Sequence, residues 1–477
     1  MTMRRPRIGL LAPFVPFYEK IAPLRAEKER FAVELGEILG GACDVIGGGL
    51  IDTEAAARTQ GEVFLRAEVD AVIVAPTLAV FGALPWAALE ILAPELPIAI
   101  WHLPPLRTVP ADYEIRELIR NSGGLGAMAL GNTLARAGRI YRFFDDRPES
   151  GALPESVRAF TIAARAANQL RRARLGLIGS VFPQMTDVLM DAEEWARVTG
   201  AEIIAVTPDE FTRECLMISD PDLEDALVQI RARHTIDDIG EDELRRSMRI
   251  SLALDGLTKR LSLSGGAFNC HGENCLQNPS LGVTGCFAVS RQTSEGRPFS
   301  CTGDLPTAVA LLIAKSLSGA AIYGELDLVD EERDLALLAN GGEGDAAFST
   351  TPMGIFGNEN FTGLSGRGAS VSVTAPEADA TLISFTPISD PKIGDYGHRL
   401  IVAEGSIDPK LRTALRGFHT GFRFAGLGVR RGFRDWIEAG ASHHLAVALG
   451  RQSNAVRLIG EIFQWEVRTV AVHKEIE

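Results

Sequence analysis

Residues 297–319, RPFSCTGDLPTAVALLIAKSLSG, combine polar side chains with the start of an apolar helix. A short strand leads through Ser300 and Cys301 into a tight turn, and Asp304 stands where the helix begins. An Asp at such a position caps free backbone N–H groups. The same carboxylate, with Thr302 beside it, would also suit the lip of an active site. The stretch therefore allows both a structural and a catalytic interpretation.

The densest polar cluster is GAFNCHGENCLQNPSLGVTGC, residues 266–286. His271, Glu273 and the cysteines are ligand types that suit zinc, although their spacing is not the usual pair-plus-pair arrangement. Buried thiols around a strand end are a second interpretation. A third places His271 and Glu273 in a substrate pocket at the carboxyl end of a strand. The sequence leaves open the roles of Cys270, Cys275, Cys286 and Cys301.

Further polar residues follow predicted strands in the second half of the chain. Glu325 follows AAIY, where a carboxylate is well placed to bind a divalent cation. Asn340 and two glycines follow the next strand, in a turn that can bring the backbone close to a ligand. The neighbouring His443 and His444 point in different directions, so usually only one of them faces a given site. An imidazole binds metal in its neutral form, with a second group to orient it.

The elements that position these residues alternate between strand and helix. Apolar runs at 7–12, 70–76 and 97–101 predict buried strands, and the apolar spacing of 22–39 predicts a helix. A second alternating unit begins at RARLGLIGS, residues 172–180. Strands that alternate with helices are typical of parallel α/β sheets.

Beyond about residue 345 the pattern changes. SVSVTA, ATLISFT and RLIVAEGSI predict short strands without helices between them. We therefore predict an α/β protein with two Rossmann-like parallel-sheet domains followed by a β-rich C-terminal domain. The expected boundaries are 1–172, 173–345 and 346–477.

The composition limits the classes of function. The 477 residues include 48 Lys and Arg against 62 Asp and Glu, so the formal net charge is −14, which disfavours nucleic acid and anionic membranes as partners. The sequence has no run of 18 apolar residues, and its first residues lead into a predicted strand too soon for a signal peptide, so we expect none. Six unevenly spaced cysteines suit a reducing compartment. We expect a cytoplasmic protein that binds neither nucleic acid nor a membrane.

These segments, in this order, resemble the L-fucose/L-arabinose isomerase superfamily, especially its fucose-isomerase-like branch. RIGLLAPFVPFYEKIAPLRAEKERF resembles the opening of that branch, and RLGLIGSVFPQMTDVLMD resembles the entry into its second domain. SEGRPFSCTGDLPTAVALLIAKSLSG resembles the segment G-x-P-x-x-C-E-G-D-x-x-A-A-L-T, and AGASHHLAVAL resembles the signature A-G-x-x-H-H. The resemblance implies a homotrimer or homohexamer that interconverts an aldose and a ketose through an enediol. It also implies Mn²⁺, or another divalent cation, and a small carbohydrate substrate.

The resemblance also implies the residues of the metal site. The two ligands fall on Glu325 and His444, with His443 as the fallback for the histidine. The acid of C-E-G-D falls on Thr302, whose hydroxyl cannot act as a base near neutral pH. Asn340 stands where arabinose isomerases use a histidine. We therefore expect Thr302, Asn340 and His443 to bind substrate.

Three functional hypotheses remain at this stage. The first is a metal-assisted sugar isomerase in which Glu325 is the base and another group replaces the lost acid. The second keeps the fold but performs acid–base or carbon–carbon chemistry on a keto-sugar or polyol, without metal. In either case the expected catalytic residues are Glu325, Asp304 and His271. The third is a non-catalytic sugar-binding protein.

Overall fold

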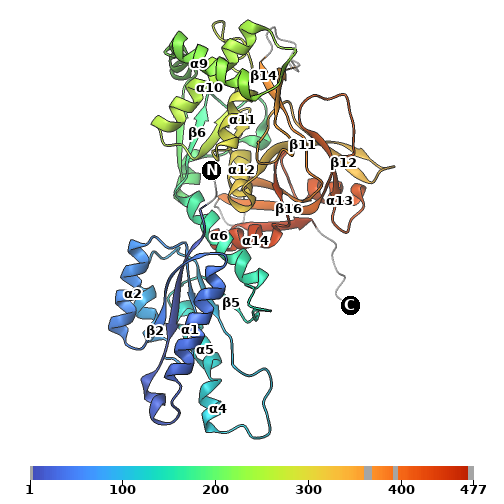
Figure 1. Cartoon of the computed structure of the whole chain (residues 1–477). Helices are drawn as coiled ribbons and strands as arrows, with labels where there is room; N and C mark the ends of the chain where they lie inside the picture. Colours follow the sequence, from blue (N-terminus) through green and yellow to red (C-terminus); the bar gives the residue numbers. More distant parts are fainter. Residues whose placement is uncertain (1–3, 359–367, 390–395, 471–477) are drawn as a thin grey trace. The chain divides into compact units, whose positions relative to one another are not determined.

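The computed structural model describes residues 4–358, 368–389 and 396–470. The chain divides into two compact units, an N-terminal unit Arg4–Asn168 and a second unit that begins at Gln169 (Figure 1). No helix in the described ranges is both long enough and apolar enough to cross a membrane.

The N-terminal unit is built on a five-stranded parallel sheet. Its strands are β1 (Arg7–Pro13), β2 (Asp44–Ile51), β3 (Ala71–Val74), β4 (Ile98–Trp101) and β5 (Tyr141–Phe144). They lie in the order β2-β1-β3-β4-β5, so the direction of sheet growth reverses between β1 and β3. Strands β1, β3 and β4 confirm the apolar runs that the sequence predicted as buried strands.

Helices accompany this sheet and bury its apolar side chains. They are η1 (Pro16–Lys20), α1 (Arg25–Gly40), α2 (Glu54–Arg66), α3 (Ala83–Leu89), α4 (Ile115–Arg120) and α5 (Gly123–Arg136). The core contains Val72 and Ile100 from the sheet, Phe64 from α2, and Leu130 and Leu134 from α5. The predicted helix at 22–39 corresponds to α1.

Helix α6 (Glu155–Arg171) lies mostly in the N-terminal unit, and only its last residues belong to the second unit. The second unit continues as a four-stranded parallel sheet. The strands are β6 (Arg174–Ile178), β7 (Glu202–Val206), β9 (Gly265–Phe268) and β10 (Phe299–Cys301), in the order β10-β9-β6-β7. Gly266 allows β9 to approach β6 closely, because a Cβ there would lie 2.2 Å from the Gly176 carbonyl oxygen. The connecting elements are η2 (Thr186–Val188), α7 (Ala192–Thr199), α8 (Pro208–Leu216), α9 (Asp220–Arg233), α10 (Glu241–Arg260) and α11 (Cys286–Ser294).

The rest of this unit is dominated by a seven-stranded, mainly antiparallel sheet. Its strands are β11 (Ala321–Asp330), β12 (Leu335–Ala339), β15 (Asp379–Ser389), β16 (Tyr396–Asp408), β17 (His419–Phe424), β18 (His444–Leu449) and β19 (Glu466–Val470). They lie in the order β15-β18-β11-β12-β17-β16-β19. Helices α13 (Val429–Glu438) and α14 (Ser453–Phe463) pack against strands of this sheet. A small sheet joins β8 (Ile236–Asp237), β13 (Gly354–Gly357) and β14 (Ala369–Ser372).

Two parallel sheets followed by a mainly antiparallel one confirm the predicted fold class. The β-rich sheet takes strands from both sides of the predicted boundary at 345/346, because β11 and β12 pair with β18 and β17. Sequence patterns cannot reveal this, since strands from distant parts of the chain complete the sheet.

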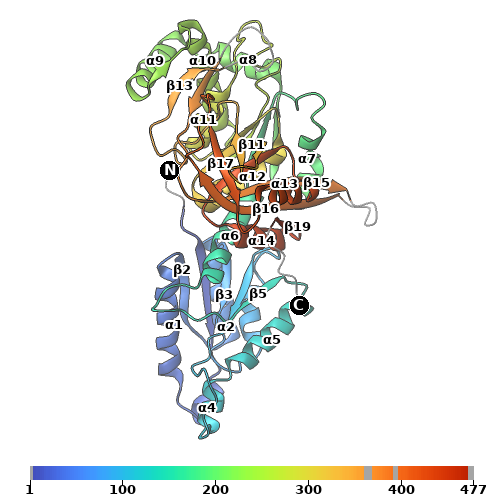
Figure 2. The ribbon, with the colours of Figure 1, turned by 90° about the vertical axis from the view of Figure 1, so that its right-hand side faces the viewer.

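Helix α12 (Leu305–Ser318) connects the two kinds of sheet. Residues 305–317 are all buried, which agrees with its mainly apolar sequence. The helix packs against β9 and β10 of the parallel sheet and against β11, β15 and β18 of the antiparallel sheet, and its place beside β11 is visible in Figure 1 and Figure 2. The start of α12 therefore lies close to strands that carry the other candidate residues.

Candidate active site

Glu325 and His444 occupy paired positions on neighbouring antiparallel strands. Glu325 lies within β11, His444 begins β18, and the two residues are directly opposite in the register. Nε2 of His444 lies 3.4 Å from Oε1 of Glu325. The imidazole is buried, whereas the Glu325 side chain keeps 37% of its exposure. The structure thus brings together the carboxylate and the imidazole that the sequence singled out as metal ligands.

Asp304 lies behind the imidazole and has two structural partners. Its Oδ1 accepts a hydrogen bond from the backbone N–H of Thr307, 2.8 Å away, and so caps α12. Its Oδ2 lies 2.7 Å from Nδ1 of His444. A carboxylate on one ring nitrogen fixes the ring and directs the other nitrogen outward. Asp304, which is fully buried, therefore orients Nε2 of His444 towards Glu325.

The two carboxylates also change the protonation of the imidazole. Burial by itself lowers the pKa of His444, but the hydrogen bonds and charges of Asp304 and Glu325 outweigh burial and raise the pKa to about 9. For Glu325, burial raises the pKa, but the contacts with His444 and Tyr323 more than compensate and hold the pKa below its ordinary value. Without a bound cation, the pair at neutral pH is thus an ionised carboxylate beside an imidazolium, and a cation that binds Nε2 would displace its proton.

Tyr323 is a member of this group that the sequence analysis missed. Its hydroxyl donates a hydrogen bond to Oε1 of Glu325 over 3.1 Å, and its ring centroid lies 4.8 Å from that of His444. Tyr323 precedes Glu325 by two residues in β11, so the alternation of a strand places both side chains on one face. That spacing is the signal from which Tyr323 could have been predicted.

Asn340 shapes the turn that follows β12. Its Nδ2 donates to the carbonyl oxygens of Tyr323 and Glu343, at 2.7 and 3.2 Å. Its Oδ1 accepts from the backbone N–H groups of Gly342 and Glu343. These bonds use all the hydrogen-bonding capacity of a carboxamide, so Asn340 holds the backbone of the turn. The residue that this turn brings into the interior is Glu343.

Glu343 is a buried carboxyl group close to the Glu325–His444 pair. Its Oε2 is buried and has no hydrogen-bond partner among the described residues. Burial raises its pKa to about 7, although the Cys301 thiol and the charge of His444 act in the opposite direction, and the negative charge of Glu325 adds to the increase. Glu343 and Glu325 are therefore two interacting carboxyl groups with opposite pKa shifts, an arrangement typical of an acid and a base.

Thr302, where the resembled family has an acid, is held in an unusual backbone conformation. Its φ is 54°, in the left-handed region that a β-branched residue rarely adopts. The residue is buried, and its hydroxyl oxygen has no hydrogen-bond partner in the described part of the chain. The Thr302 carbonyl oxygen accepts a hydrogen bond from the Phe182 N–H at 2.8 Å, and this bond to a distant segment holds the backbone of the turn in place. Backbone strain of this kind concentrates at functional sites.

His443 lies directly beside His444, with ring centroids 3.8 Å apart, whereas His271 lies beside Cys270 and Cys301. The His443 side chain is exposed, and its Nδ1 contacts Oδ2 of Asp187, which also accepts from the hydroxyl of Ser442. These hydrogen bonds, acting against burial, lower the pKa of Asp187 to about 2. His271 packs edge-to-face on Phe182, with ring centroids 6.0 Å apart. The sequence analysis had not connected Asp187 with the histidine pair.

The four cysteines of uncertain role are buried free thiols. Cys270 and Cys301 form a pair with their sulfur atoms 3.9 Å apart, and both lie near His271. Cys286 accepts a hydrogen bond from Nδ2 of Asn358 at 3.3 Å, and Cys275 is fully buried.

The Glu325–His444 pair has donor types that suit a divalent cation. Nε2 of His444 points towards Glu325 while Nδ1 contacts Asp304, as in many histidine metal ligands. Within the described ranges, no third His, Cys, Asp or Glu side chain places a ligand atom within 4.8 Å of both. Two protein ligands would leave most of the coordination shell to water and substrate oxygens, so the residues fit a cation of this kind only as an open site.

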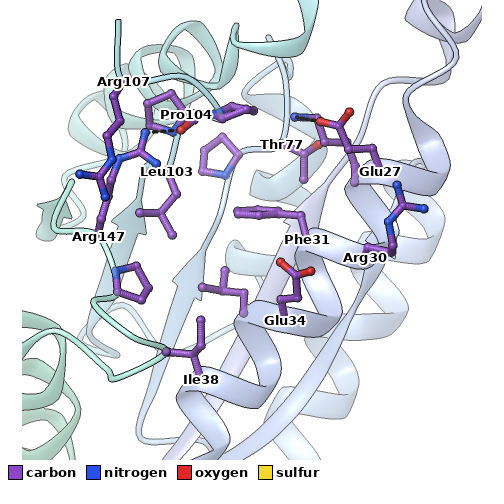
Figure 3. A pocket seen from close by; sticks show the side chains of 16 residues that line it. Glu27, Arg30, Phe31, Glu34, Ile38, Thr77, Leu103, Pro104, Arg107 and Arg147 are labelled. Atoms are coloured by element: carbon purple, nitrogen blue, oxygen red, sulfur yellow. Dashed lines mark hydrogen bonds and ion pairs between the residues drawn. The ribbon is translucent and has the colours of Figure 1, made fainter.

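The N-terminal unit has a separate pocket of about 450 Å³ at the carboxyl ends of its parallel strands. Phe31 and other residues of α1 form one wall, and residues that follow β3, β4 and β5 form the rest. Figure 3 shows Arg107 and Arg147 on one side of the pocket and Arg30 on the other. Ligands of parallel α/β sheets bind at this edge, near the point where the strand order reverses. No candidate of the sequence analysis lies here.

Comparisons with known proteins give distant similarities. No known family profile matches the chain. Sulfoquinovose isomerases from Priestia aryabhattai and Priestia megaterium (strain ATCC 12872 / QMB1551) are each 20% identical over 316 residues, or 65% of this chain and 66% of each relative. The match thus spans just under two thirds of the relatives' length.

Among solved structures, a solute-binding protein of an ABC transporter from Burkholderia multivorans covers 64% of this chain and 92% of its own. Its sequence identity is 13% and its TM-score is 0.17, so the likeness carries no argument about fold or function. The similarity to the two isomerases, by contrast, supports a relationship between this chain and sugar isomerases.

Proposed function

We propose that this chain interconverts an aldose and a ketose through an enediol, assisted by Mn²⁺ or another divalent cation. The observation that carries the proposal is the contact of His444 Nε2 with Glu325, with Asp304 fixing the imidazole from behind. The similarity to sulfoquinovose isomerases supports the reaction class.

The proton transfer is assigned to the two carboxyl groups. Glu325, whose pKa is lowered, is ionised at neutral pH and accepts the proton from the substrate carbon next to the carbonyl. Glu343, with a pKa of about 7, is available in both protonation states and can return a proton. In this proposal Glu343 replaces the acid that the resembled family carries at position 302. Tyr323 holds the Glu325 carboxylate in place through its hydroxyl group.

The residues that would hold the cation are Glu325 and His444. A bound divalent cation would polarise the carbonyl of the substrate and stabilise negative charge on the enediol. Asp304 keeps Nε2 of His444 available for this role because it occupies Nδ1. Thr302 and His443 remain the proposed substrate contacts, whereas the side chain of Asn340 is fully bonded within its turn and instead holds the backbone next to Glu343.

The substrate class is a small carbohydrate, and the names of the relatives suggest which sugars to test first. We would incubate the pure protein with Mn²⁺ and a panel of pentoses, hexoses, deoxy-sugars and acid sugars that includes sulfoquinovose. The expected result is aldose–ketose exchange of one member, with solvent deuterium entering C1 or C2. Absence of both exchange and deuterium incorporation across the panel would contradict the proposal.

A second candidate is acid–base or carbon–carbon chemistry on a keto-sugar or polyol without a metal. The observation that favours it is the ligand set, since among the described residues no third ligand atom lies close to both Glu325 and His444, while Glu343 and Glu325 already form an acid–base pair. Elemental analysis separates the two candidates. One Mn²⁺ per chain that is lost in Glu325→Gln supports the isomerase, whereas full activity after chelation supports the second candidate.

The proposal includes an assembly and a location. A homotrimer or homohexamer follows from the resemblance, and the proposed cytoplasmic location follows from the unevenly spaced cysteines, which suit a reducing compartment. Light scattering of the full chain at several concentrations would measure the oligomeric state.

A further inference from the structure

We propose that Cys270, His271 and Cys301 form a binding site for a soft divalent cation, namely zinc, distinct from the Glu325–His444 pair. One ligand atom from each of the three side chains lies within 4.8 Å of the others. Among the described residues, these are the only three His, Cys, Asp or Glu side chains that meet this condition.

The spacing of the two sulfur atoms matches a tetrahedral zinc site. Sγ of Cys270 and Sγ of Cys301 are 3.9 Å apart. Two thiolates at zinc–sulfur distances of about 2.3 Å in tetrahedral geometry are separated by about 3.8 Å. A disulfide would require about 2.0 Å, so the pair is not arranged for that bond. Without metal, one thiol donates a weak hydrogen bond to the other, and this keeps the sulfur atoms at the required separation.

The fold explains why residues 31 positions apart in sequence meet here. Strands β9 and β10 are parallel neighbours in which Phe268 pairs with Cys301. Cys270 follows Phe268 by two residues, and its N–H donates back to the Phe268 carbonyl oxygen at 3.0 Å. Both cysteines therefore lie at the same carboxyl edge of the sheet, and His271 follows directly.

The third proposed ligand, His271, has a ring nitrogen without a hydrogen-bond partner among the described residues. Nδ1 of His271 is buried and has no hydrogen-bond partner in the part of the chain that the structure describes. Phe182 packs edge-to-face on this ring and restricts its orientation. A buried, unpartnered ring nitrogen beside two thiols costs free energy unless a ligand satisfies it. A metal ion would do so.

The charge of the site also favours zinc. Cys270 and Cys301 are 2% and 8% exposed, so an uncompensated charge at this position would be unfavourable. Two thiolates neutralise one Zn²⁺ ion, and soft thiolate ligands select zinc over Mn²⁺. Three protein ligands leave the fourth position to water or a small donor, as in zinc sites that are not purely structural.

Titration of the chelator-treated full chain with Co²⁺, a spectroscopic substitute for zinc, tests the inference. We expect a thiolate-to-cobalt charge-transfer band that saturates at one equivalent and is removed by Zn²⁺ but not by Mn²⁺. Binding without a charge-transfer band, or no binding, would overturn the inference. This measurement uses the unmodified protein, so the result does not depend on whether a variant folds.

Variants then locate the ligands. Cys301→Ser and Cys270→Ser should abolish the band, and His271→Asn should weaken metal binding by more than the about 10- to 100-fold typical of losing an outer-shell partner. Cys215→Ser is the matched control, because Cys215 is an equally buried thiol of the same unit that lies outside the cluster. It should leave the band unchanged.

The Cys301 thiol contacts Glu343 of the proposed isomerase site, so Glu325→Gln is used to separate metal binding by the cluster from metal binding by the Glu325–His444 pair. The charge-transfer band should survive that substitution, whether or not the chain isomerises any sugar. If Glu325→Gln removes the bound Co²⁺, the ion occupies the Glu325–His444 pair and the inference is wrong.

Discussion

Oε1 of Glu325 lies 3.4 Å from Nε2 of His444, across a register in which the two residues are directly opposite on β11 and β18. The carboxylate of Glu325 is partly exposed and the imidazole of His444 is buried, so a ligand can reach the carboxylate while the imidazole is held in place beneath it. Asp304 anchors the imidazole at its other nitrogen, and Tyr323 anchors the carboxylate.

Glu325→Gln should abolish isomerisation while the fold is retained. Losing a general base typically lowers the rate by a factor of about 10² to 10⁴. The turnover rate and the solvent-deuterium exchange of an active substrate would both be measured. Asp379→Asn is the control, because Asp379 forms an exposed ion pair with Arg451 and such pairs contribute little. A fully active Glu325→Gln variant would show that Glu325 is not the base.

Asp304→Asn and Asp304→Ala should separate capping from orientation of the imidazole. Asn retains an oxygen for the cap of α12, whereas Ala loses it at a cost of about 0.5–2 kcal/mol in the free energy of unfolding. Both variants lose the carboxylate that faces Nδ1 of His444. We therefore expect similar losses of activity, but the larger loss of stability in Asp304→Ala. Equal stability of the two variants in urea unfolding would contradict the capping role.

The metal-free protein should become less stable as the pH rises through the pKa of His444. The folded-state pKa of about 9 lies above the ordinary value of 6.5, so the contribution of His444 is complete below pH 6.5 and is lost as the pH rises to about 9. The free energy of unfolding, measured by urea at several pH values, should decrease over this window. His444→Gln should remove that decrease; if the pH dependence persists unchanged in the variant, another group is responsible.

Glu343→Gln should remove a second pH dependence, at lower pH. The pKa of Glu343 is raised from 4.5 to about 7, so the folded protein loses stability as the pH rises through this range. The substitution imitates the protonated carboxyl group and should make the protein more stable than the parent at pH 8, by at most about 3 kcal/mol. At pH 4 the two should differ little. Greater stability of the parent at pH 8 would count against a raised pKa of Glu343.

Thr302→Gly should stabilise the chain by about 1 kcal/mol, because glycine adopts positive φ without steric strain. Thr302→Ser is the control, since it removes the β-branch but keeps a Cβ and a hydroxyl group, and it should stabilise less. Chemical unfolding midpoints give the order. If Gly is the least stable of the three residues at this position, packing of the threonine outweighs its backbone strain.

The sequence alone determined the features that depend on neighbouring residues. The apolar runs specified β1, β3 and β4, and the change of pattern after residue 345 indicated the β-rich part. Asp304 before an apolar run predicted its cap on α12. These features could be predicted from the sequence because strand periodicity, helix periodicity and capping each depend on only a few neighbouring residues.

Only the tertiary structure decided which of these residues meet. The contact of Asp304 with His444 spans 140 positions and exists because β18 inserts beside β11 and against the start of α12. The same holds for Cys270, His271 and Cys301, which converge because β9 and β10 are parallel neighbours. Strand order and register arise from packing of the whole unit. A hydrophobic pattern over a few residues does not specify which distant strand pairs with which.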